Sequence, residues 1–81
     1  MTLFSRRSDP SDVRPGYSYK RRHGSTITEK VTVLDLREDA FGIPHVRFSV
    51  TYERPTADRV VTNLKVLALQ SFVDLYRERV A

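Results

Sequence analysis

Cysteine is absent from this 81-residue chain, and glycine occurs only three times. The absence of cysteine excludes disulfide bonds and thiolate metal sites. Neither a P-loop nor a G-x-G-x-x-G motif is present, so phosphate binding by a glycine-rich loop is unsupported. No apolar run approaches the roughly 18 residues that span a bilayer, and residues 1–15 lack the apolar centre of a signal peptide. We therefore expect a soluble, cytoplasmic protein.

Signatures of catalysis are also missing. There is no G-x-S-x-G motif, and only two histidines are available as bases. Glu38 and Asp39 could pair their carboxylates, but neighbours in a surface turn are usually solvated. His23 and His45 lie outside any local metal-ligand motif, and we interpret them as an exposed turn residue and a polar residue on the solvent face of a strand. The sequence thus predicts a protein that is not an enzyme and has neither metal nor cofactor.

The positive charge is concentrated in the first third of the chain. Residues 1–25 carry six cations and two anions, whereas residues 26–81 carry eight of each sign. Residues 1–15 have almost nothing apolar after Phe4, so they cannot bury enough surface to offset the entropy of ordering. We predict a disordered basic tail over residues 1–15 and a single small domain over residues 16–81.

The first long strand is predicted over residues 26–37, which are rich in β-branched side chains and bounded by turn residues. Ile27, Val31 and Val33 lie on one face of this strand, whereas Leu34 and Leu36 lie on the other. A β-bulge or bend near Val33 and Leu34 would return the apolar residues to one core. Bent strands of this kind allow small sheets to curl into barrels.

Residues 45–53 form the clearest strand pattern of the chain, with apolar and polar side chains alternating over nine positions. The inward face holds Val46, Phe48, Val50 and Tyr52. His45 and Arg47 point to the polar face. Gly42 suits a turn, and Pro44 belongs at the start of a strand because it cannot donate a ladder hydrogen bond. We therefore interpret the segment FGIPHVRF as a hairpin corner that sets the register of this strand.

Two more elements complete the expected fold. Residues 59–68 predict a strand that carries Val60, Leu64 and Val66 on one face and a mixed set on the other. The period then changes to that of a helix. The helical stripe consists of Leu69, Phe72, Val73, Tyr76 and Val80. Two arginines in the last turn suit the negative end of the helix dipole.

These elements predict a mainly β fold with one C-terminal helix. Their arrangement resembles the SH3-like barrels of the Tudor and KOW type, through "PGYSYKRR" (15–22) before the long strands and "LALQSFVDLY" (67–76) near the end of the chain. The likeness covers residues 15–78 as a pattern, and no family motif matches residue for residue. It implies a small, partly open antiparallel barrel. The alternative is an α+β antiparallel sheet with the helix packed on one face.

The short strand predicted over residues 17–22 has the composition of a nucleic-acid platform. Its tyrosines can stack on bases and its cations can neutralise phosphates. Barrels of the KOW type commonly bind RNA or ribosomal partners, so the resemblance implies the same activity. The candidate nucleic-acid-binding residues are Tyr17, Tyr19, Lys20, Arg21, Arg22 and Arg47. The tyrosines would serve equally well as core residues, and the cations as a solvated sheet edge.

An exposed sheet edge supports a second function. Strands that do not close into a full barrel leave an edge that can accept a partner's strand or a second copy of the chain. A homodimer would also compensate for the small core of so short a chain. We therefore predict a non-catalytic protein-interaction or structural module, with RNA binding as the alternative. No membrane partner and no small-molecule substrate are expected.

Overall fold

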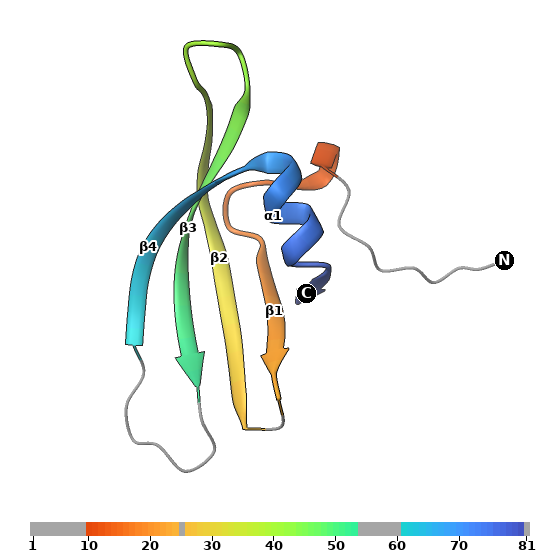
Figure 1. The fold of residues 1–81 in the computed structure, drawn as a ribbon, viewed down its shortest axis with the longest axis vertical. Helices are drawn as coiled ribbons and strands as arrows, with labels where there is room; N and C mark the ends of the chain where they lie inside the picture. Colours follow the sequence, from red (N-terminus) through yellow and green to blue (C-terminus); the bar gives the residue numbers. More distant parts are fainter. Residues whose placement is uncertain (1–9, 25, 54–60, 81) are drawn as a thin grey trace, which may run out of the picture.

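The computed structural model describes residues 10–24, 26–53 and 61–80. They form a five-stranded antiparallel sheet of order β4-β3-β2-β1-β5, with one α-helix on one face (Figure 1). The strands are β1 (Ser18–His23), β2 (Ile27–Glu38), β3 (Pro44–Glu53), β4 (Val61–Ala68) and β5 (Glu78–Val80), and the helices are the 3-10 helix η1 (Pro10–Asp12) and α1 (Leu69–Leu75). The sheet is not closed. The predicted fold class, mainly β with one C-terminal helix, is confirmed.

The β2–β3 hairpin has its corner where the sequence predicts it. β3 begins at Pro44, and Gly42 adopts a positive φ of 80° in the preceding turn. The ladder between β2 and β3 is irregular between Val33 and Asp35, where the β-bulge was expected. The bulge brings Leu36 against the core, whereas Leu34 is left on the surface.

An aromatic cluster joins α1 to the sheet. The ring of Phe72 on α1 lies 5.3 Å from that of Tyr19 on β1 and 5.0 Å from that of Phe48 on β3. Tyr76, directly after the helix, lies 5.0 Å from Phe72. Full burial of a phenylalanine contributes roughly 1.5–3 kcal/mol to the stability of a fold. The helix is only seven residues long, so this packing rather than intrinsic helix propensity keeps it folded.

The end of the chain differs from the prediction of one helix through Val80. α1 ends at Leu75, and Glu78–Val80 form β5, which pairs with Ser18–Lys20 of β1. The spacing of Tyr76 misled the prediction, because its ring continues the helical stripe although its backbone has left the helix at φ −112° and ψ 88°. Pairing with β1 supplies hydrogen-bond partners along an edge that would otherwise be open.

The described structure begins at Pro10, inside the tail that was predicted over residues 1–15. η1 contacts α1, and Val13 is 5% exposed within the core. Gly16 donates its N–H to the Val33 carbonyl at 2.8 Å. The single apolar side chain of Val13 therefore secures this segment, a role that its polar neighbours conceal in the sequence. Residues 1–9 lie outside the described part of the chain.

The sheet has two unlike faces. We call the side that carries α1 the helix face and the other side the open face. The buried side chains of β1, β2 and β3, apolar except for Glu29, lie on the helix face, while most hydroxyl and charged side chains occupy the open face. No element in the described parts of the chain covers the open face (Figure 1). The open face and the outer edge of β4 are thus available for contact.

Candidate interaction surface

The outer edge of β4 is the longest unpaired strand edge of the described structure. β4 is eight residues long and pairs on one side only, with β3. Leu64 and Val66 lie on the open face with 66% and 58% of their surfaces exposed, whereas Leu67 on the opposite face packs against the core. The sequence predicted Leu64 and Val66 on the more apolar face of this strand. In the structure, that face is turned away from the helix. Apolar side chains beside an unpaired edge are a site of strand pairing.

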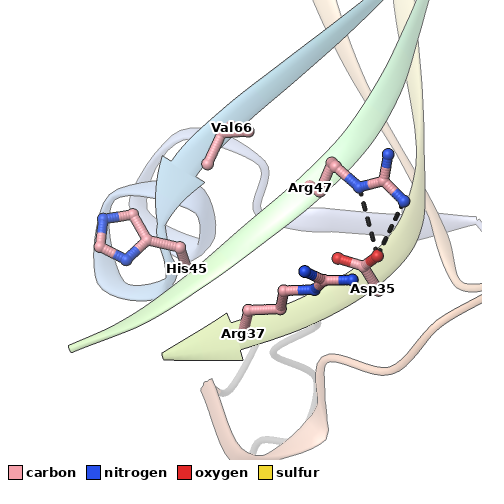
Figure 2. A pocket seen from close by; sticks show the side chains of 5 residues that line it. All are labelled: Asp35, Arg37, His45, Arg47 and Val66. Carbon is pink, nitrogen blue, oxygen red and sulfur yellow. Dashed lines mark hydrogen bonds and ion pairs between the residues drawn. The ribbon is translucent and has the colours of Figure 1, made fainter. Parts of the chain in front are cut away.

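A hollow on the open face adjoins this edge (Figure 2). Its volume is about 300 Å³, and Asp35, Arg37, His45, Arg47 and Val66 line it. Three adjacent strands contribute to it, because the register aligns Asp35 of β2 with Arg47 of β3 and Arg47 with Val66 of β4. The hollow thus combines an apolar wall on the edge strand with cationic side chains further inside the sheet.

The charges in the hollow are partly paired. Arg47 donates from Nε and Nη2 to Oδ2 of Asp35, at 3.2 and 2.8 Å. The hydrogen bonds from Arg47 hold the pKa of Asp35 below its usual range, and the same contact raises the pKa of Arg47. The Arg37 guanidinium lies beside this pair in Figure 2 and is exposed. Arg37 therefore supplies the excess positive charge of the hollow.

The turn of the β2–β3 hairpin is organised by one aspartate. Oδ1 of Asp39 accepts the N–H groups of Phe41 and Ile43 at 2.8 and 3.0 Å, and the hydrogen bond from Ile43 holds the pKa of Asp39 low. His45 donates from Nδ1 to the carbonyl of Ile43 at 2.9 Å. Asp39 is thus a turn-forming residue, and Phe41 at the tip is 87% exposed.

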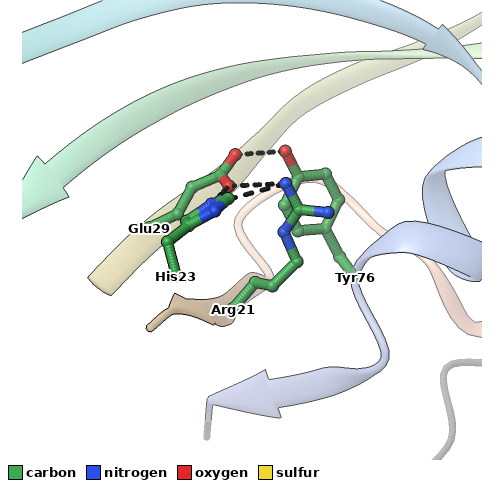
Figure 3. A network of polar contacts seen from close by, with 4 residues as sticks. All are labelled: Arg21, His23, Glu29 and Tyr76. Carbon is green, nitrogen blue, oxygen red and sulfur yellow. Dashed lines mark hydrogen bonds and ion pairs between the residues drawn. The ribbon is translucent and has the colours of Figure 1, made fainter. Parts of the chain in front are cut away.

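On the helix face, three polar side chains meet at a buried carboxylate (Figure 3). Glu29 of β2 is 1% exposed. Tyr76 donates its hydroxyl to Oε2, while His23 Nε2 and Arg21 Nη2 donate to Oε1 at 2.6 and 3.2 Å. The Arg21 guanidinium also lies 5.6 Å from the centre of the Tyr76 ring. The cluster connects β1, β2 and the segment that follows α1.

Opposing effects set the ionisation of this cluster. Burial would raise the pKa of Glu29, but hydrogen bonds from Tyr76, His23 and Arg21 outweigh it, and the pKa lies below its ordinary value. Burial, and then the bond to Glu29, raise the pKa of Tyr76. Tyr76 is therefore a neutral donor to an ionised carboxylate. With every contact directed inward, this arrangement suits cross-linking of the fold better than chemistry on a ligand.

The structure separates the six residues proposed for nucleic-acid binding. Tyr19 is 1% exposed beneath α1, and Tyr17 packs against the core with Arg79 over its ring at 4.0 Å. Lys20 and Arg22 are exposed on the open face, whereas Arg21 turns to Glu29 on the helix face. Arg47 lies on the open face, within the hollow and paired with Asp35, as described above. The ring of Tyr19 is therefore not available for stacking on a base, and the ring of Tyr17 is in contact with Arg79.

Two features escaped the sequence reasoning. Glu29 has the same parity as the apolar residues of its strand, Val31 and Val33, and that parity is a signal of burial. The exposure of Leu64 and Val66 had no such signal, because alternation does not reveal which face of an edge strand a helix covers.

No protein-family model, curated protein or solved structure matches this chain. Among residues 10–24, 26–53 and 61–80, no helix has the length and apolar character needed to cross a membrane. The same residues contain no group of three or more histidine and acidic side chains placed to hold a metal ion. The function is therefore inferred from the surfaces described above.

Proposed function

We propose that this protein is a non-catalytic, cytoplasmic interaction module that binds a protein partner by adding a strand to the outer edge of β4. The observation that carries this proposal is the unpaired outer edge of the eight-residue strand β4, with Leu64 and Val66 exposed at 66% and 58% beside it. Main-chain hydrogen bonds along such an edge supply affinity, and alternate side chains supply specificity.

The edge has few of the devices that block strand pairing. Proteins protect edges with proline, bulges, short strands or charges. β4 contains no proline and one charged residue, Lys65, and its ladder with β3 is regular over all eight pairs. The opposite edge of the sheet is covered in part by β5. A partner strand would therefore find its longest regular template at β4.

A pull-down from cytoplasmic extract tests this proposal. The edge variant Leu64→Lys/Val66→Lys places two charges beside β4, and the control Gln70→Lys/Ser71→Lys adds the same charge on the exposed side of α1. We expect the wild type and the control to capture the same proteins after nuclease treatment, and the edge variant to lose them. Capture of one set by all three chains would contradict binding at β4.

RNA binding is the second candidate, and one observation favours it. Lys20 of β1 and Lys30 of β2 are direct cross-strand neighbours on the open face, with Arg22 exposed on the same face. Like charges directly opposite each other destabilise a sheet, and a phosphate backbone would relieve that repulsion. Glu78, paired with Lys20 on its other side, offsets part of it. This cluster of Lys20, Arg22 and Lys30 does not include Tyr17 or Tyr19, so the candidate does not depend on them.

The salt dependence of binding tests this second candidate. Three cations that contact phosphates of single-stranded RNA predict a log–log slope of about −2 for affinity against salt. The variant Lys20→Ala/Arg22→Ala/Lys30→Ala should flatten this slope. Absence of binding to any single-stranded RNA at low salt would exclude the candidate.

A further inference from the structure

We infer that the strand accepted by β4 is an extended, acidic segment of a partner protein, and not a second copy of this chain. This inference rests on the proposed strand addition and adds the chemistry of the partner. β4 has one charged residue, the cation Lys65, and no acidic residue. The hollow beside it carries one excess positive charge, from Arg37, because its other cation Arg47 is paired with Asp35. Electrostatic complementarity selects partners by opposite charge.

The register of the sheet determines what an added strand would meet on the open face. Val66 is aligned with Arg47, and Ala68 is aligned with His45, which is aligned in turn with Arg37. Adjacent strands lie about 4.8 Å apart, so the Cα of an added residue opposite Val66 would lie about 10 Å from that of Arg47. The Arg47 guanidinium is turned to Asp35 on β2, away from β4, so it does not reach across this gap (Figure 2). On the open face the added strand would thus meet the apolar wall of the hollow at Val66 and not its cations.

On the helix face, the added strand would meet Lys65 directly. Lys65 is exposed, and its β3 neighbour in the ladder is Phe48, so it has no acidic cross-strand partner. An acidic residue opposite Lys65 would form a favourable cross-strand pair. On the open face, Leu64 and Val66 favour apolar neighbours. The predicted partner segment therefore alternates apolar and acidic residues.

Pairing of two copies through β4 lacks this complementarity. In an antiparallel pair, residues directly opposite each other point to the same face. A two-fold axis through Lys65 would oppose two lysines, and one through Leu64 would place each Lys65 opposite the neutral Asn63 of the other copy. Neither register gives Lys65 an acidic partner. Self-pairing is thus the weaker use of this edge.

Three labelled nine-residue peptides test the inference by fluorescence anisotropy with the full chain. All have blocked ends and valine at alternate positions, and the remaining positions hold glutamate, glutamine or lysine. We expect the glutamate peptide to bind at least about tenfold more tightly than the glutamine peptide at low salt, and the lysine peptide to bind least. The preference should shrink at high salt because the charges are screened.

Two controls assign the contact. Lys65→Gln changes one exposed residue and should bring the affinity for the glutamate peptide close to that for the glutamine peptide. A glutamate peptide methylated on every backbone nitrogen cannot donate to the ladder and should lose binding. Retained binding of this peptide would contradict strand addition itself.

The remaining outcomes separate the two proposals. Equal or tighter binding of the glutamine peptide would overturn the acidic partner and leave strand addition standing. A doubled mass in sedimentation at low salt, without peptide binding, would make a second copy the occupant. No peptide binding and no self-association would overturn both proposals.

Discussion

Glu29 shows how one residue can decide the assembly of a small fold. A buried carboxylate is costly unless hydrogen bonds and opposite charge compensate for the lost solvation. Here a neutral phenol, an imidazole and a guanidinium supply that compensation, and Tyr76 comes from 47 residues further along the chain. The carboxylate therefore ties the β1–β2 hairpin to the C-terminal segment.

Replacement Glu29→Gln should lower the free energy of unfolding by about 1.5–3 kcal/mol, the range for hydrogen bonds to a charged group. The amide keeps the shape of the side chain but removes its charge, so Arg21 and His23 lose a charged acceptor. Urea denaturation at neutral pH measures the loss. A change below about 0.5 kcal/mol would show that the cluster contributes little to stability.

The same substitution predicts a difference in acid stability. The pKa of Glu29 is lowered in the folded state. The ionised carboxylate therefore stabilises the fold above its unfolded pKa of about 4.3. This stabilisation is lost as the pH falls through the folded pKa. The gap in unfolding free energy between the wild type and Glu29→Gln should therefore narrow in acid. Asp35 and Asp39 also have lowered pKa values, but they are common to both proteins and largely cancel in the difference.

At the scale of elements, the sequence predicts what local pattern determines. The alternation of β3 and the change of parity in β2 located a strand, its inward face and the bulge between Val33 and Asp35. β5 is three residues long, too short for any periodicity. Its position depends on the free edge of β1, which is close in space but distant in sequence. The helical spacing of Tyr76 and Val80 hid this pairing.

Removal of residues 78–81 tests the role of β5. The deletion removes three paired residues and the contact between the Arg79 guanidinium and the Tyr17 ring. A cation–π contact of this kind contributes roughly 0.5–1 kcal/mol at exposed sites. We expect amide hydrogen exchange to accelerate in Ser18–Lys20 while β3 keeps its protection. The control Arg77→Ala should leave both unchanged. A loss of helical circular dichroism with unaltered β1 exchange would instead indicate a helix through Val80.

At the scale of the whole molecule, one helix on one face leaves the opposite face and the β4 edge uncovered in the described structure (Figure 1). The sequence predicted an exposed edge in general terms and placed Arg47 on the polar face. It could not identify β4 as the edge, because strand order arises from contacts between distant segments. The hollow was equally hidden, since it needs Asp35, Arg47 and Val66 aligned across three strands.

Ionic strength should act in opposite directions on the two kinds of association open to β4. The Lys65 side chains of two copies repel each other at low salt in the register that opposes them, and the Debye length falls from about 10 Å at 0.1 M to about 3 Å at 1 M. We expect sedimentation equilibrium to show a monomer at low salt and weak self-association at high salt, whereas binding of an acidic peptide weakens over the same range. The edge variant Leu64→Lys/Val66→Lys should remain monomeric throughout.

Wild type mixed with Lys65→Glu should associate more strongly at low salt than either chain alone, because a two-fold register through position 65 then opposes unlike charges. Dimers that dissociate as salt is added would show that an attraction between charges, and not the screened edge, holds two copies together.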